Sequence, residues 1–189
     1  MEQWRIRTYV YTHIYTHIHK MCIIFVCDSL LRGTEGPMCR ADPPLRQVCC
    51  FPGAQVKDIT RKLPSLVRPS DCYPLLPFRV GGDEATACCP TVIKRDFRAL
   101  GWLVRERRAR VIFSSLLPVV GSNIRRNRCT QSTNTWLRAW CHGRNLGFFD
   151  NGRAYMAPGL LVTDGIHLSQ SRKSVFAHKL VGLIGRALN

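Results

Sequence analysis

The sequence predicts an α/β fold built on a five-stranded, mostly parallel sheet, and two observations support that prediction. Short apolar runs alternate along the chain with segments of helical periodicity, which is the pattern of strand–helix–strand units. The first run, Met21–Cys27, shows no polar alternation, as expected of a strand that is buried on both faces. Right-handed crossovers then bring the carboxyl ends of all the strands to one edge of the sheet.

The remaining elements follow from the same criteria. Apolar runs predict further strands at 46–51, 75–80, 110–114 and 146–149, the second of these interrupted by Pro77. Helical spacing of apolar residues predicts helices that include 56–67, 93–104, 136–141 and 176–188. Between these elements we expect a basic loop at 121–128 and an irregular stretch at 151–167.

Length and composition are those of one globular domain. The 189 residues suffice for one complete core, and an apolar content of 46% argues against global disorder. Residues 1–20 stand apart, because Tyr11–His19 repeats a four-residue unit that nothing downstream shares. We therefore expect a low-complexity extension at 1–20 and the folded domain at 21–189. A metal site at His13, His17 and His19 is the less favoured alternative.

The charge balance is strongly basic, with 28 Lys and Arg against 12 Asp and Glu, a net charge of +16. Such an excess of positive charge favours binding to polyanionic surfaces such as nucleic acid, although it is also compatible with helix faces that are only exposed to solvent. The arginines are densest at 105–110 and 125–128. Arg125, Arg126 and Arg128 are therefore the candidate residues for contact with RNA.

The ten cysteines include no C-x-x-C pair, so the ligand spacing of a zinc ribbon or finger is missing. Reduced, mostly buried thiols in an intracellular, cytoplasmic protein are the favoured interpretation. The apolar run that follows Lys20 ends at Asp28, which is too early for a convincing signal peptide. No run approaches the roughly 20 apolar residues of a membrane span.

A polar pair, Asp28-Ser29, stands where the first predicted strand ends. Ser29 is thereby placed at the carboxyl edge of the sheet, where α/β proteins bind ligands. A serine nucleophile needs a base, usually a histidine that a carboxylate holds in place. The end of the chain offers both, in Asp164 and His167. On a tight turn, a carboxylate three residues before a histidine can accept a hydrogen bond from the Nδ1–H of its ring, which leaves the Nε2 atom to face Ser29. Each fragment alone is common by chance, and their order along an α/β chain favours catalysis.

Taken in order, these blocks resemble those of the SGNH hydrolases, also called GDSL-type esterases and lipases, across roughly 21–188. Residues 27–30 are similar to the family's G-D-S-L block, and 164–167 to its final D-x-x-H. The resemblance implies a three-layer α/β/α sandwich of flavodoxin-like kind with a five-stranded parallel sheet. It also implies that Ser29 is the nucleophile, that His167 is the base oriented by Asp164, and that no metal or cofactor is needed. The implied oxyanion-hole positions are Ser29, Gly53 and Asp83.

Two residues depart from the family pattern. Cys27 replaces the glycine of G-D-S-L and adds a side chain directly before the nucleophile loop. Asp83 stands where the family's G-x-N-D block has an asparagine, and a carboxylate donates no hydrogen bond and repels an oxyanion. Loss of one oxyanion donor costs about 3–4 kcal/mol, or roughly 10²–10³ in rate. We therefore expect a weakened serine esterase that cleaves a small lipid or acetyl ester through an acyl-serine intermediate.

The sequence is also similar to the esterase-like domain in open reading frames of vertebrate LINE-type retrotransposons, over 27–33, 48–66, 93–100 and 148–169. This resemblance implies the alternative function. In that case the chain is a catalytically decayed module of retrotransposon origin that binds nucleic acid through its basic surface.

Overall fold

The computed structural model describes residues 22–29, 32–39, 45–67, 74–82, 89–117, 124–151 and 169–188. Five strands form one sheet in the order β2-β1-β3-β4-β5, and every neighbouring pair is parallel. The strands are β1 (Ile23–Cys27), β2 (Arg46–Cys50), β3 (Leu75–Arg79), β4 (Arg110–Ser114) and β5 (Gly147–Phe149). The five predicted strands and their parallel direction are confirmed.

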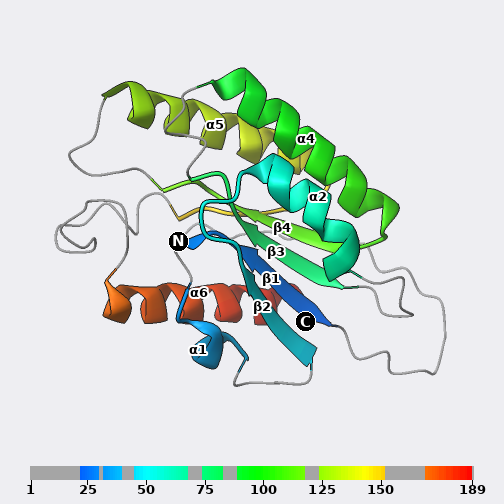
Figure 1. Cartoon of the computed structure of the whole chain (residues 1–189), viewed down its shortest axis with the longest axis vertical. Helices are drawn as coiled ribbons and strands as arrows, with labels where there is room; N and C mark the ends of the chain where they lie inside the picture. Colours follow the sequence, from blue (N-terminus) through cyan, green and yellow to red (C-terminus); the bar gives the residue numbers. More distant parts are fainter. Residues whose placement is uncertain are drawn as a thin grey trace.

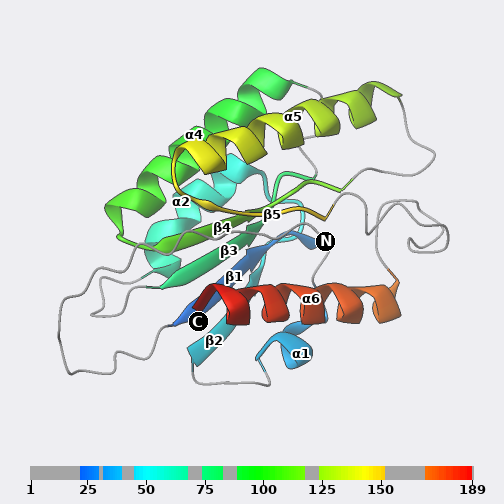
Figure 2. The ribbon, with the colours of Figure 1, turned by 180° about the vertical axis from the view of Figure 1, so that it is seen from behind.

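Helices cover both faces of the sheet, which gives the predicted three layers (Figures 1 and 2). One face carries α2 (Val56–Leu66), α4 (Pro90–Glu106) and α5 (Ile124–Gly143). The other face carries α1 (Glu35–Cys39) and α6 (Gln170–Leu188). None of the helices in the described part of the chain has the length and hydropathy of a membrane-spanning segment.

The two cores explain why β1 lacks polar alternation. Ile24 and Val26 belong to the core under α2, α4 and α5, whereas Phe25 and Cys27 belong to the core under α1 and α6. Both sets of side chains are therefore buried, and β1 is apolar at every position. Phe113 of β4 anchors the first core, with its ring against the ring of Phe78 at a centroid distance of 5.3 Å.

The fold differs from the sequence prediction at three places. Residues 124–128, predicted as a basic loop, are helical, because α5 begins at Ile124. The helix buries Thr130 and Thr133 beside Cys129, so its inner face carries too little apolar periodicity to be recognised. The five-residue α1 was not predicted, since so short a helix has no readable period. Finally, β3 continues through Pro77, which is registered with Ile112 of β4.

The predicted low-complexity extension at 1–20 lies outside the described residues. The same holds for 152–168, which make up most of the stretch predicted to be irregular. The proposed boundary between an extension and a domain therefore stays a prediction.

Candidate functional site

Ser29 lies at the carboxyl end of β1, next to the point where the strand order reverses. In the order β2-β1-β3-β4-β5 that switch point falls between β1 and β3. Open α/β sheets bind ligands in the crevice that this reversal creates. Ser29 is half-buried in a short helical turn, and its carbonyl accepts a hydrogen bond from the Arg32 N–H at 3.2 Å. The structure thus places the predicted nucleophile at the predicted edge of the sheet.

The residue before the predicted nucleophile, Asp28, is held in a buried ion pair with Arg79 at the end of β3. Nη1 of Arg79 lies 3.1 Å from Oδ2 of Asp28, and the two side chains are 4% and 7% exposed. The backbone repeats the connection, since the Asp28 N–H donates to the Arg79 carbonyl at 2.9 Å. A Cβ on Gly82 would lie 3.2 Å from the same carboxylate oxygen. Sequence reasoning missed this pair, although an arginine at the end of an otherwise buried strand was a visible signal.

Gly53 forms the turn after β2, the strand that pairs with β1. Its φ of +72° is a left-handed conformation that glycine adopts without strain, while a Cβ there would meet nothing within 4 Å. The Phe51 N–H donates to the Cys27 carbonyl at 2.8 Å, so the ends of β2 and β1 are joined just before the two loops begin. A hollow of about 440 Å³ opens at this turn, lined by Pro52, Gly53, Ala54, Asp58, Arg61 and Lys62. Ser29 and Gly53 therefore follow neighbouring strands at the same edge, as predicted.

A second polar group closes the same edge after β4 and β5. The Asn151 N–H donates to the Ser115 hydroxyl at 2.7 Å, and its side-chain amide donates to the Ser114 hydroxyl. Asn151 is 1% exposed, and within the described part of the chain its Oδ1 has no hydrogen-bond partner. These contacts fix the chain at the point where the segment 152–168 begins. Sequence reasoning did not single out Asn151; the small polar residues that end β4 were the available signal.

Three residues of the predicted catalytic machinery lie outside the described residues: Asp83, Asp164 and His167. Their roles as oxyanion position, orienting acid and base stay predictions. The histidines of the less favoured metal site, His13, His17 and His19, also lie outside. Within the described ranges, no group of three or more His, Cys, Asp and Glu side chains could hold a metal ion.

The eight cysteines in the described part of the chain are thiols, and half of them are buried. Burial raises the pKa of Cys141 to about 12. Burial also raises the pKa of Cys49, with a smaller contribution from the neighbouring Cys50. Cys89 is exposed, so the prediction of mostly buried thiols fits this part of the chain incompletely.

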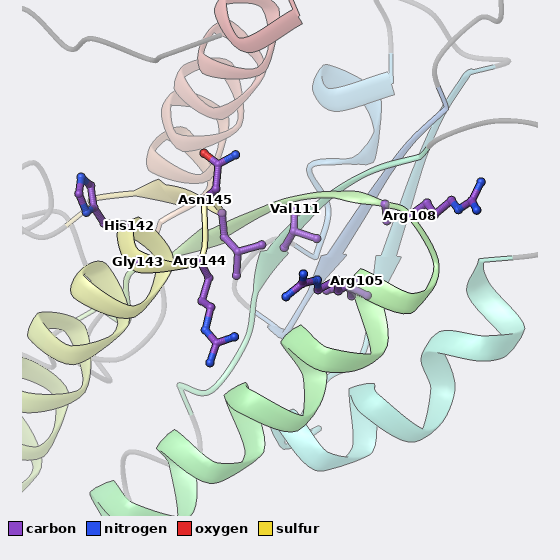
Figure 3. A pocket seen from close by; sticks show the side chains of 10 residues that line it. Arg105, Arg108, Val111, His142, Gly143, Arg144 and Asn145 are labelled. Atoms are coloured by element: carbon purple, nitrogen blue, oxygen red, sulfur yellow. The ribbon is translucent and has the colours of Figure 1, made fainter. Parts of the chain in front are cut away.

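The predicted RNA-contact residues lie in the first turns of α5, where Arg125 and Arg128 are exposed and Arg126 is half-buried. A separate basic hollow of about 730 Å³ lies at the opposite edge of the sheet, where α4 and α5 end (Figure 3). In Figure 3 the side chains of Arg105 and Arg144 reach toward the space between these helix ends. Because the carboxyl end of a helix attracts cations, both arginines are placed where their charge stabilises the helix ends.

The fold defined by this sheet, its switch point and its two helical layers is that of the GDSL-type, or SGNH, lipolytic hydrolases. The predicted resemblance is thus confirmed at the level of the fold. A lipolytic protein of the G-D-S-L family from Veillonella parvula superposes with a TM-score of 0.74 at 16% identity, covering 88% of this chain and 100% of that one. A GDSL-like lipase from Bacteroides thetaiotaomicron superposes with a TM-score of 0.70 at 15% identity, covering 87% and 86%.

A third solved structure is the esterase domain of the ORF1 protein from the zebrafish ZfL2-1 retrotransposon. It is 25% identical, covers 88% of this chain and 99% of that one, and superposes with a TM-score of 0.48. No protein-family model matches the sequence, and no curated protein matches it significantly.

Proposed function

We propose that this protein is a serine esterase that cleaves a carboxylic ester through an acyl-Ser29 intermediate. The observation that supports this most directly is the position of Ser29, at the carboxyl end of β1 and beside the switch point of the sheet. The GDSL-type fold supports the same reaction class, because the solved structures that share it include lipases and other lipolytic proteins.

In the proposed reaction, Ser29 Oγ attacks the ester carbonyl carbon while His167 Nε2 accepts the hydroxyl proton. Asp164 holds the imidazole in the productive orientation and stabilises the imidazolium that forms. The backbone N–H groups of Ser29 and Gly53 donate to the oxyanion of the tetrahedral intermediate. Collapse expels the alcohol, which takes the proton from His167, and water then releases the acid by the same route.

Gly53 suits this role because its left-handed turn follows the strand next to β1, with open space at its Cβ position. Asp83 is the weak component, since its carboxylate offers no donor where the family has an amide. We infer slow turnover of a small lipid or acetyl ester.

A fluorophosphonate probe tests the proposal, because it reacts covalently with activated serine hydroxyls. The full-length protein should be labelled, and Ser29→Ala should abolish the labelling. Ser65→Ala is the matched control, since Ser65 lies exposed on α2 and caps the Lys62 carbonyl at 2.8 Å. His167→Ala should slow the labelling strongly while the protein stays folded. Labelling that persists in Ser29→Ala would refute the assignment.

The net charge of +16 and the exposed arginines of α5 favour a second candidate function, the binding of nucleic acid. We propose contact with the RNA backbone through Arg125, Arg126 and Arg128. Binding of a fluorescent single-stranded RNA should then weaken as salt rises, and replacement of the three arginines by glutamine should reduce the log–log slope by about 2. Replacement by lysine keeps the charge and should keep the slope. An unchanged slope in the glutamine variant would refute this candidate, whatever the outcome with the probe.

A further inference from the structure

Two cysteines face each other across β1 and β2, at the ends of these strands and just before the candidate catalytic residues Ser29 and Gly53. Cys27 and Cys50 are register partners on these parallel strands, and both pack in the core under α1 and α6. Their Sγ atoms lie 2.8 Å apart. Neighbouring strands lie about 4.8 Å apart, within the roughly 4.4–6.8 Å between Cα atoms that a disulfide accepts.

Two other cysteines of the same two segments, Cys22 and Cys49, are poorly placed to compete for either thiol. Cys49 packs in the opposite core, under α2 and α4, because successive side chains of β2 point to opposite faces. Cys22 also packs against that opposite core. Cys22 and Cys49 are four register positions apart, which is about 13 Å along the strands and too far for a bond. Among these four cysteines, the geometry therefore selects the pair of Cys27 and Cys50.

We propose that Cys27 and Cys50 form a reversible disulfide under mild oxidation by a hydroperoxide, and that this bond slows the chemistry at Ser29. The second half of this proposal rests on the proposed esterase function. Cys50 is half-buried whereas Cys27 is 0% exposed, so Cys50 meets the oxidant first. Its thiol attacks hydrogen peroxide to give a sulfenic acid and water. The Cys27 thiol then attacks that sulfur, so that one S–S bond forms and a second water leaves.

The position of the bond explains its effect on the site. Cys27 precedes Ser29 by two residues, and Cys50 precedes Gly53 by three. The Phe51 N–H already donates to the Cys27 carbonyl at 2.8 Å, so little slack separates the pair from the two loops. Closing the sulfur atoms from 2.8 Å to a bond requires a movement of about 0.7 Å. Displacement of reacting groups by about 1 Å can cost roughly 10²-fold in rate, so we expect at least a tenfold slower reaction in the oxidised protein.

The test uses the reduced full-length protein treated with hydrogen peroxide, followed by alkylation of the remaining thiols and tryptic digestion without reductant. A crosslink should join the peptides 21–32 and 47–57. Each peptide contains two cysteines, so variants identify the bonded pair. Cys50→Ser should lose the crosslink, while the matched control Cys49→Ser, one residue away and on the opposite face, should keep it. Fluorophosphonate labelling of Ser29 is measured in parallel before oxidation, after it, and after dithiothreitol.

The proposal is supported if, in the wild type, the crosslink forms, the labelling rate falls at least tenfold on oxidation, and dithiothreitol restores that rate. The labelling rate of Cys50→Ser should not change with hydrogen peroxide. The proposal is overturned if no crosslink forms, if the crosslink survives in Cys50→Ser, or if labelling is equally fast in the oxidised protein. Failure of the esterase function is recognised separately, because the reduced protein would then not be labelled at all.

Discussion

The buried ion pair between Arg79 and Asp28 allows a quantitative test of how the end of β1, just before Ser29, is held. Arg79→Met keeps much of the length and apolar volume of the side chain but removes its charge, which leaves the Asp28 carboxylate buried without this cation. At 3.1 Å and an effective dielectric constant of about 20, the lost attraction is about 5 kcal/mol. Measured losses on breaking buried pairs are about 3–5 kcal/mol. We expect the free energy of unfolding to fall by that amount, a large share of the roughly 5–15 kcal/mol of a typical domain.

Urea denaturation followed by tryptophan fluorescence measures this change, since the chain has four tryptophans. Arg61→Met is the matched control. Arg61 also pairs with an aspartate, Asp58, but its side chain is 73% exposed. Exposed pairs contribute about 0–1 kcal/mol, so this control should be nearly as stable as the wild type.

The double variant Asp28→Asn with Arg79→Met separates charge from packing. If the cost of Arg79→Met comes from a buried unpaired carboxylate, neutralising Asp28 should recover most of it. A loss in Arg79→Met as small as that of Arg61→Met would refute the reasoning. A double variant as unstable as Arg79→Met would assign the loss to packing instead.

Three further predictions follow from the site and the fold. On the proposed assignment of residue 83 to the oxyanion hole, Asp83→Asn supplies a donor and should raise kcat on a p-nitrophenyl ester by roughly 10²–10³; an unchanged kcat would refute that assignment. Gly101→Ala would place a Cβ 2.3 Å from Cη2 of Trp140, so the free energy of unfolding should fall by about 1–3 kcal/mol in urea titrations despite alanine's better helix propensity. The Gln55 N–H, and then Arg61, lower the pKa of Asp58 below its ordinary 3.8, so its stabilisation is present at neutral pH and lost as the pH falls through the lowered value. The stability difference between wild type and Asp58→Asn should therefore shrink in acid, and a constant difference between pH 7 and pH 3 would contradict it.

The sequence was sufficient to predict the sheet because its strands are short, apolar and separated by amphipathic helices. The run Ile23–Cys27 is buried on both faces, and that is a property of its own residues. The first turns of α5 could not be recognised in the same way. The buried side of α5 includes Thr130 and Thr133, and neither residue type indicates a buried helix face.

The position of candidate-site residues at one edge of the sheet was predictable where a motif is local, whereas contacts between distant partners were not. Ser29 and Gly53 each follow a recognisable strand, so their shared edge could be inferred from the alternation alone. The pairing of Asp28 with Arg79 spans 51 residues, and it becomes visible when β3 lies beside β1. The cross-strand contact of Cys27 with Cys50 depends in the same way on the register of β1 against β2.

The strand order also bears on edge-to-edge pairing between molecules. In the described sheet the two edges are β2 and β5, and an open edge can pair with the edge of another molecule. β5 is three residues long, and β2 begins with Arg46 and the exposed Gln47. A short edge and a charged one are both devices that discourage edge-to-edge aggregation. The apolar strand that leads to Ser29 lies between β2 and β3, away from either edge, and is therefore protected from intermolecular pairing while the sheet remains folded.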